Sequence, residues 1–347
     1  MMNVQAMETT ASFARDLQVV DLGLGMSAAL FAKLLVECGA EVTRLEPEAG
    51  DPFYQVYPAY AVWQRGKRIE KSEGSEPERL DALLDKADIC IVGGEDYPGR
   101  TWRLDAVAMS DRHERLIVTE IDACPPGLEG CNHEAVDLLA QARSGLSHEH
   151  FSTRAIAFAL PAPTYGAAIQ AMLGTLAALY AREDSGRGQV VSTSLLQGAL
   201  SWLGPLWFQA SKPDALSDGI VPLDPRQLIF RCADGHYVQM FIAVAGGLGK
   251  LYKVLGIEDA SINPSDRGIS SGAGDPKKFF GDVELIGNFV ARWKSTDLLE
   301  SLRAGGLAGE RVSEPGVCWD DPQASANGII RTDEQGMRYV GLPMQGL

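Results

Sequence analysis

Residues 17–46 constrain the fold of this chain more than any other segment. LQVVDLGLG is a short apolar run that ends at glycines, SAALFAKLLVECGA follows with apolar side chains at helical spacing, and EVTRLEPEAGDP adds a second strand and a turn. A strand, a helix and a strand within about 30 residues make a βαβ unit, which implies a parallel sheet. Residues 76–94 predict a further helix and strand, and residues 115–122 one more strand. We therefore predict an α/β fold.

The glycines after the first strand do not predict a dinucleotide site. GLGMSA lacks the third glycine of the G-x-G-x-x-G fingerprint, which shapes the turn and lets the backbone approach a pyrophosphate. We interpret this segment as an ordinary strand-to-helix turn.

Charge and cysteine usage exclude several classes of partner. The net charge is −15 and the basic residues are spread evenly, which argues against nucleic-acid binding. Six scattered cysteines without a C-x-x-C pair are typical of a reducing compartment, and the N-terminal residues lack the pattern of a signal peptide. The motif HEH at residues 148–150 has no third ligand nearby, so we predict no metal site. We expect a cytoplasmic protein.

The segment 155–181 contains no charged residue and no histidine. A membrane-spanning helix is disfavoured because Pro161, Pro163 and Gly166 interrupt it and leave too short an apolar run. We predict an extended run, a break and then a buried helix from Gly166 to Ala181. A second uncharged block at residues 190–210 follows the polar turn REDSGRGQ.

After about Ser217 the pattern changes to alternating strands around Asp234 and Gly235, which form a good hairpin turn. We predict a large domain at residues 1–217, a small α+β domain at residues 218–312, and a C-terminal segment, residues 313–347, that returns to the large domain and carries two strands around DEQG.

Between residues 17 and 343 the chain resembles the family III CoA-transferases of the CaiB/BaiF type, which include formyl-CoA transferase and alpha-methylacyl-CoA racemase. The resemblance lies in the first βαβ unit and in QRGKR, VDLLAQARSGL, GTLAALYAREDSGRGQVVSTSLLQGAL, ADGHYV and DPQASANGII, which occur in the family's order. It implies a Rossmann-like large domain with a parallel sheet, a smaller α+β domain and an interlocked dimer. It also implies acyl-CoA or a small carboxylic acid as substrate, with no tightly bound cofactor.

The position of the family's nucleophile is the main departure from this resemblance. The transferases form an acyl anhydride on a catalytic Asp, and counting back from Gly174 places that residue at Thr164. A threonine hydroxyl cannot form such an anhydride, so we expect no confident catalytic residue here. Tyr165 beside it is either a hydrogen-bond donor or a packed aromatic residue.

The racemase branch pairs a His with an Asp in the helix that here reads EAVDLLAQ. Val136 stands at the His position and only Asp137 remains, so two-base proton exchange is not supported. We regard Asp137 as more consistent with a structural role.

Four basic residues stand where the family places bases near the CoA phosphates and adenine: Arg65, Lys67, Arg68 and Arg103. Either they bind the nucleotide or they are solvated surface bases. Around them the sequence has Pro47 after Glu46 and the acidic GEDYPG, and carboxylates near a diphosphate are repulsive.

Three hypotheses follow. In the first, the chain is the subunit without a nucleophile in a hetero-oligomer with a second family III chain. In the second, it is a repurposed enzyme, alone or as a homodimer, that performs an isomerisation, cyclisation or hydrolysis. In the third, it is an active transferase with Asp137 as a relocated carboxylate.

Overall fold

The structure is a computed structural model that describes residues 13–57, 59–72, 77–94, 104–123, 134–148, 154–204, 228–259, 280–333 and 336–341. The chain divides into two compact units. The first contains Met1–Pro205 and Pro322–Leu347, and the second contains Leu206–Asp321. Each unit is described by itself.

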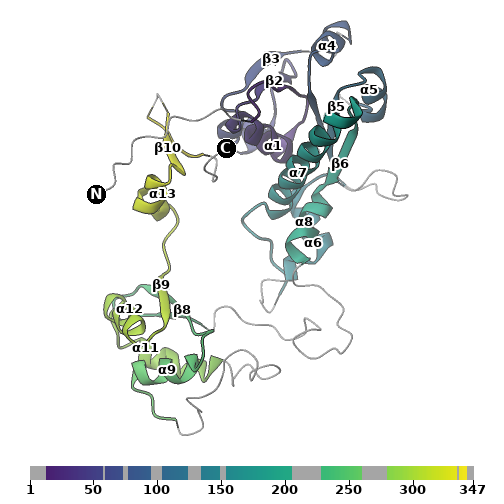
Figure 1. The fold of residues 1–347 in the computed structure, drawn as a ribbon. Coiled ribbons are helices and arrows are strands. Elements are labelled where there is room, and N and C mark those ends of the chain that lie inside the picture. Colours follow the sequence, from purple (N-terminus) through teal and green to yellow (C-terminus); the bar gives the residue numbers. More distant parts are fainter. Residues whose placement is uncertain are drawn as a thin grey trace, which may run out of the picture. The chain divides into compact units, whose positions relative to one another are not determined.

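The first unit is built on a six-stranded parallel sheet with the order β3-β2-β1-β4-β5-β6 (Figure 1). This order is the Rossmann strand order, so the predicted α/β fold with a Rossmann-like parallel sheet is confirmed. The strands are β1 (Gln18–Asp21), β2 (Glu41–Glu46), β3 (Arg68–Lys71), β4 (Ile89–Gly93), β5 (Ile117–Asp122) and β6 (Val190–Ser194).

Helices cover both faces of this sheet. On one face, α1 and α7 contribute Phe31, Leu35 and Ala171 to a core that includes Ile91 of β4. On the other face, α4 and α5 pack against alternate residues of the same strands. The helices of this unit are α1 (Gly25–Glu37), α2 (Phe53–Val56), α3 (Tyr60–Trp63), α4 (Pro77–Leu84), α5 (Ala106–Arg112), α6 (Asp137–Ser144), η1 (Leu146–His148), α7 (Ala162–Ser185) and α8 (Leu195–Leu203).

The turn between β1 and α1 packs closely against the end of β4 through its backbone. Leu24 N donates to Gly93 O at 3.0 Å, and Leu24 pairs with Gly94 as an isolated bridge. A Cβ atom on Gly94, whose φ is +101°, would lie 1.8 Å from Leu24 O. Gly25 and Ser27 of the first turn of α1 are buried. The geometry agrees with an ordinary strand-to-helix turn.

Helix α7 differs from the prediction at both its start and its burial. It begins at Ala162, not after Gly166, because Pro163 in the first turn needs no intrahelical donor. Only one side of the helix is buried, so the uncharged segment is not wholly a core element. Among the described residues, no helix is long and apolar enough to span a bilayer.

Two glycines set the close crossing of α7 and α8. A Cβ atom on Gly166 would lie 2.3 Å from Gly198 O, and one on Gly198 would lie 2.3 Å from Pro163 O. Only glycine permits this approach of the two backbones. The crossing fixes the first turn of α7, which contains Thr164.

The second unit contains an antiparallel sheet of order β7-β8-β9. One side of the sheet packs on helices through Val238, Leu251, Ile286 and Leu298. The hairpin predicted around Asp234 and Gly235 is present. The elements are β7 (Ile229–Arg231), β8 (Tyr237–Phe241), α9 (Gly247–Leu255), α11 (Val283–Val290), α12 (Ser295–Ala304), β9 (Ala308–Arg311) and η4 (Val317–Asp320).

The end of the chain belongs to the first unit. It forms α13 (Pro322–Ala326) and an antiparallel hairpin of β10 (Ile330–Thr332) and β11 (Arg338–Val340), which are the two strands predicted around DEQG. Lys33 Nζ donates to Val340 O at 3.4 Å, and Arg331 pairs with Glu37 at 3.2 Å. These contacts hold the hairpin against α1.

Candidate functional site

The structure brings together the two site positions that sequence analysis singled out on different helices. Thr164 lies in the first turn of α7, and its Oγ1 donates to Asp137 Oδ2 of α6 at 2.7 Å. The Thr164 backbone N–H donates to the same oxygen at 2.9 Å. Thr164 is 0% exposed and Asp137 is 7% exposed. The carboxylate therefore caps one of the backbone donors at the N-terminus of α7.

The other oxygen of this carboxylate is also occupied. Gln141, one turn further along α6, donates from Nε2 to Asp137 Oδ1 at 2.7 Å. Gln141 Oε1 in turn accepts from Phe158 N at 2.8 Å. Asp137 thus accepts three hydrogen bonds, and the network joins α6, α7 and the segment that leads into α7.

Tyr165 points away from this network. Its ring meets Trp63 edge-on, with centroids 6.4 Å apart, and the residue is 38% exposed. Partial burial raises the pKa of the Tyr165 phenol, so the group stays protonated at neutral pH. Tyr165 can donate a hydrogen bond but is a poor base.

Arg65, the first of the predicted phosphate-binding residues, contacts the C-terminal hairpin. Its NH2 group pairs with Asp333 at 2.8 Å, and its guanidinium lies 4.2 Å from the centre of the Tyr339 ring. These contacts give Arg65 a role in holding β10 and β11.

Lys67 lies inside the protein rather than on its surface. Its ammonium donates to Asp21 Oδ2 at 3.1 Å, to Ala29 O at 3.1 Å and to Gln64 Oε1 at 2.7 Å. These contacts use all three of its donors. Burial lowers the pKa of Lys67 to about 8, although Asp21 opposes this shift.

Arg68 is the most exposed of the described basic residues in this group. It begins β3, and its NH2 group donates to Thr43 Oγ1 at 2.9 Å while its Nε pairs with Glu70 at 3.2 Å. Arg103 lies outside the described residues.

A fully buried arginine that the sequence did not point to lies next to Lys67. Arg44 of β2 pairs with Asp21 and Glu46, both at 3.0 Å, and with Asp51. Burial lowers the pKa of Arg44, but Asp21, Tyr60, Asp51 and Glu46 together outweigh it and raise the pKa overall. The strand EVTRLE also contains Glu41, Thr43 and Glu46, so its pattern gave no clear signal that Arg44 is buried.

Glu46 is engaged on both oxygens, whereas the acidic residues of GEDYPG, Glu95 and Asp96, lie outside the described residues. Oε1 accepts from Arg44, and Oε2 pairs with Lys71 at 2.9 Å. Burial, followed by the charge of Glu46, raises the pKa of the neighbouring Tyr54 to about 12.

No metal centre is present among the residues that the structure describes. His148 belongs to η1, and the rest of the HEH motif lies outside the described residues. The described residues therefore do not test this motif as a metal site.

This chain has a Rossmann-like α/β domain, defined by its strand order and by helices on both faces of the sheet. Hydrogen bonds between Thr164 and Asp137 link the start of the long helix α7 to α6. The chain belongs to CoA-transferase family III, because its sequence matches that family over residues 15–346. It is therefore a family III CoA-transferase-like protein of acyl-CoA metabolism.

Two relatives in this family have named activities. The chain is 25% identical over 340 residues to the (R)-2-hydroxy-4-methylpentanoate CoA-transferase of Clostridioides difficile, with 90% of this chain and 83% of the relative covered. It is 26% identical over 249 residues to the succinyl-CoA:mesaconate CoA-transferase of Haloarcula marismortui, with 64% of this chain and 62% of the relative covered.

Solved structures share the fold. Rv3272 from Mycobacterium tuberculosis superposes with a TM-score of 0.77 at 18% identity, covering 98% of this chain and 94% of that chain. A CaiB/BaiF family protein from Brucella suis superposes with a TM-score of 0.76 at 19% identity, covering 97% of this chain and 93% of that chain.

Proposed function

We propose that this chain is the subunit without the catalytic carboxylate in a hetero-oligomeric family III CoA-transferase. The observation that carries the proposal is Thr164, which stands where the family resemblance expects the catalytic Asp. Its hydroxyl and its backbone N–H are both used to bind Asp137. The buried hydroxyl of Thr164 links α7 to α6, and a hydroxyl cannot form the acyl anhydride that the family's mechanism needs.

Asp137 is a poor replacement for the missing nucleophile. Its two oxygens accept from Thr164 N, Thr164 Oγ1 and Gln141 Nε2, and hydrogen bonds to a carboxylate reduce its tendency to attack a thioester. The third hypothesis, a relocated carboxylate, therefore receives less support than the first.

An exposed apolar stripe on α7 supports a partner chain. Tyr165, Ile169, Leu173 and Tyr180 recur at intervals of one or two helical turns along one side of the helix, and their exposures are 38%, 45%, 63% and 79%. Contiguous exposed apolar surface of this kind marks interaction sites in soluble proteins. In the proposal, a second family III chain with its own catalytic Asp covers this stripe in an interlocked dimer.

For CoA itself, the proposal relies on Arg68 and Arg103. The ammonium of Lys67 is committed to internal oxygens, and Arg65 is held by Asp333 and Tyr339. An exposed guanidinium binds phosphate oxygens in bidentate fashion. Arg68 is the most exposed of the three described bases of this group, and a phosphate would compete with Glu70 for its guanidinium.

One observation favours the alternative of a repurposed enzyme. The phenol of Tyr165 is partly exposed, stays protonated and lies next to Thr164 in the first turn of α7. A protonated phenol at the start of a helix can stabilise a developing oxyanion in an isomerisation, cyclisation or hydrolysis. The alternative predicts turnover by this chain alone that Tyr165→Phe abolishes.

Co-expression with a family III chain that carries the catalytic Asp tests the proposal. We expect the two chains to co-purify and to transfer CoA between an acyl-CoA and a free carboxylic acid. Replacing the partner's catalytic Asp by Asn should abolish transfer, whereas Thr164→Ser in this chain should leave it intact. Full activity of this chain as a homodimer would contradict the proposal.

A further inference from the structure

Arg65 joins the loop before β3 to the C-terminal hairpin. Its NH2 group pairs with Asp333 at 2.8 Å, and its guanidinium lies 4.2 Å from the centre of the Tyr339 ring. Asp333 directly follows β10, and Tyr339 lies within β11. The loop, residues 64–67, leads directly into Arg68 at the start of β3. A contact with the end of the chain therefore holds the segment that carries Arg68.

The backbone hydrogen bonds of this loop are long. Gln64 N donates to Ala61 O at 3.2 Å, Arg65 N donates to Val62 O at 3.4 Å, and Lys67 N donates to Gln64 O at 3.3 Å. The usual N–H···O range is about 2.7–3.2 Å, so these bonds lie at or beyond its long end. The conformation of the loop therefore depends strongly on what its side chains contact.

Helix α1 supports the loop. Lys67 Nζ donates to Ala29 O at 3.1 Å. Gly66 has a φ of +78°, and a Cβ atom there would lie 2.6 Å from Val36 Cγ1. This close approach places the loop directly against α1.

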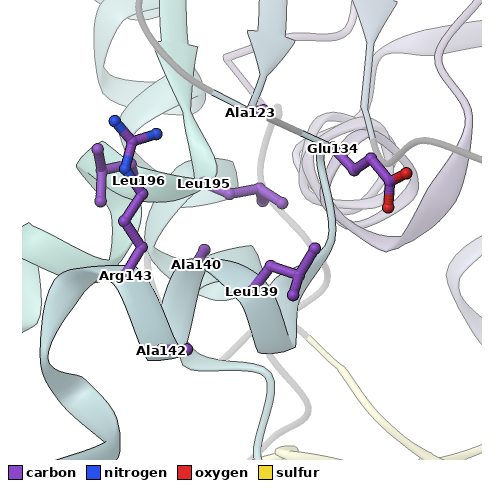
Figure 2. Close-up of a pocket in the computed structure, with 8 residues that line it drawn as sticks. All are labelled: Ala123, Glu134, Leu139, Ala140, Ala142, Arg143, Leu195 and Leu196. Atoms are coloured by element: carbon purple, nitrogen blue, oxygen red, sulfur yellow. The ribbon is translucent and has the colours of Figure 1, made fainter. Parts of the chain in front are cut away.

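The same helix supports the hairpin. Lys33 Nζ donates to Val340 O at 3.4 Å, and Arg331 pairs with Glu37 at 3.2 Å. The loop, the hairpin and α1 therefore form a closed ring of contacts, in which Arg65 joins the loop to the hairpin. This ring shares no residue with the hollow beside α6 in Figure 2, which is lined by residues in or just before α6 and by residues that follow β5 and β6.

The affinity of Arg68 for a phosphate depends on how the chain holds it. Its NH2 group donates to Thr43 Oγ1 at 2.9 Å and its Nε pairs with Glu70 at 3.2 Å, so a phosphate has to compete for the guanidinium. Bidentate binding of a phosphate also requires one orientation of the planar guanidinium. A looser loop before Arg68 should therefore weaken phosphate binding.

We propose that Arg65 is a positioning residue for the CoA site: it seats loop 64–67 on the hairpin and so holds Arg68 where its guanidinium meets a phosphate. Arg65 itself does not touch CoA, because Asp333 and Tyr339 hold its guanidinium. The inference rests on the role of Arg68 in the proposed function, and it adds the C-terminal hairpin to that site.

Binding of coenzyme A to the full-length protein, measured by titration calorimetry, tests the proposal. Arg65→Ala should weaken binding about fivefold, the combined effect of one partly exposed ion pair and one cation–π contact. Arg65→Lys keeps a cation beside Asp333 and Tyr339, so it should weaken binding only about twofold. Asp333→Asn removes one of the two contacts and should also weaken binding about twofold.

The sign of the Asp333→Asn effect separates positioning from direct binding. If Arg65 bound a phosphate of CoA itself, Asp333 would compete with that phosphate, and its removal would tighten binding. If Arg65 acts through the hairpin, the removal of Asp333 weakens binding. In that case, adding Asp333→Asn to Arg65→Ala has no further effect, because both changes remove the same contact.

Coupling between two sites is reciprocal, so CoA should also act on the hairpin. Saturating CoA should slow amide hydrogen exchange in β10 and β11 about fivefold in wild type and should leave it unchanged in Arg65→Ala. A purely structural role of Arg65 predicts no such difference.

Two further variants serve as controls. Arg68→Ala should weaken CoA binding at least as much as Arg65→Ala, and it tests the proposed CoA site itself. Arg187→Gln removes an exposed ion pair with Glu114 in the same unit and should not change binding. The thermal midpoint of each variant checks its folding.

Three outcomes overturn the inference and leave the proposed CoA site in place. The first is that Arg68→Ala weakens CoA binding while Arg65→Ala, correctly folded, does not. The second is that Asp333→Asn tightens CoA binding. The third is that CoA leaves hydrogen exchange in the wild-type hairpin unchanged. Unchanged binding by Arg68→Ala, or no CoA binding by wild type, would instead remove the proposed CoA site and the inference with it.

Discussion

Replacing Thr164 by aspartate introduces a second carboxyl group against Asp137. In the native protein the Thr164 hydroxyl donates to Asp137 Oδ2 at 2.7 Å, in surroundings that exclude water from Thr164 altogether. The new side chain removes that donor and places two acids in one buried site. Like charges this close do not both ionise, so the pair should hold one proton at neutral pH.

The cost follows from the charge of the pair and its distance. Two unit charges about 4 Å apart repel by about 4 kcal/mol at an effective dielectric constant of about 20. Keeping one carboxyl protonated at neutral pH costs a similar amount, because each pH unit above an ordinary Asp pKa of about 3.9 costs about 1.4 kcal/mol. We therefore expect Thr164→Asp to lower the free energy of unfolding by about 4 kcal/mol at pH 7.

The pH dependence gives the sharper signature. The folded variant holds a proton that the unfolded chain releases, so its stability falls as pH rises. Relative to wild type, the loss should shrink to about 1.5 kcal/mol at pH 5, where protonation is cheap and the introduced carboxylic acid, once protonated, restores the donor to Asp137. Urea denaturation at the two pH values measures both free energies.

Thr164→Ser and the double variant Thr164→Asp, Asp137→Asn are the controls. Serine keeps the hydroxyl and should cost about 1 kcal/mol at either pH for its lost methyl group. The double variant has a single carboxylate with an amide donor beside it, so its stability should depend on pH no more than that of Asp137→Asn. A loss for Thr164→Asp that is equal at pH 5 and pH 7, and that Asp137→Asn does not relieve, would refute the description of this contact.

Other features of the first unit give further predictions. Gly198→Ala should lower the free energy of unfolding by about 2 kcal/mol, because its Cβ would lie 2.3 Å from Pro163 O. Gly204→Ala is the control: its Cβ would lie 3.6 Å from Leu200 O, so it should cost under about 0.5 kcal/mol. Equal losses for the two variants would contradict the close crossing of α7 and α8. Lys67 has a pKa of about 8 in the folded protein, so between pH 8 and about pH 10.5 the unfolded chain binds the proton that the folded protein has lost. The free energy of unfolding of wild type should therefore rise over this range by up to about 3 kcal/mol relative to that of Lys67→Met. Parallel curves of stability against pH for the two proteins would refute the burial of this ammonium. Arg65→Ala removes the contacts with Asp333 and Tyr339, so it should speed amide hydrogen exchange in β10 and β11 by a factor of about five. Arg68→Ala, the control, should leave this exchange unchanged. Unchanged exchange in Arg65→Ala would contradict the role of Arg65 in holding the hairpin.

Local sequence patterns predicted the elements that depend on local interactions. The strand, helix and strand of residues 17–46 and the hairpin around Asp234 and Gly235 were identified from periodicity and turn residues, and both are present. The start of α7 was not predicted correctly, because Pro161 and Pro163 were interpreted as ending a helix, although a proline is tolerated in the first turn of a helix.

Contacts between distant residues could not be predicted in the same way. Thr164 and Asp137 were each singled out through the family resemblance, but they are 27 residues apart and meet only because α6 packs against α7. Arg44 was not singled out from the sequence, and Lys67 was predicted as a phosphate-binding or solvated base. Their burial follows from Asp21 and Asp51, which the sheet and the loop after β2 bring together. Packing of whole elements decides such pairs.

In the proposed function, this chain has no carboxylate that forms an acyl anhydride. The purified chain alone, incubated with an acyl-CoA and a free carboxylic acid and then trapped with hydroxylamine or borohydride, tests it by intact-mass measurement. We expect no covalent acyl or CoA adduct and no transfer from this chain alone, and we expect both to appear after a chain bearing the catalytic Asp is added. A stable adduct on this chain by itself, or transfer without a partner, would contradict it.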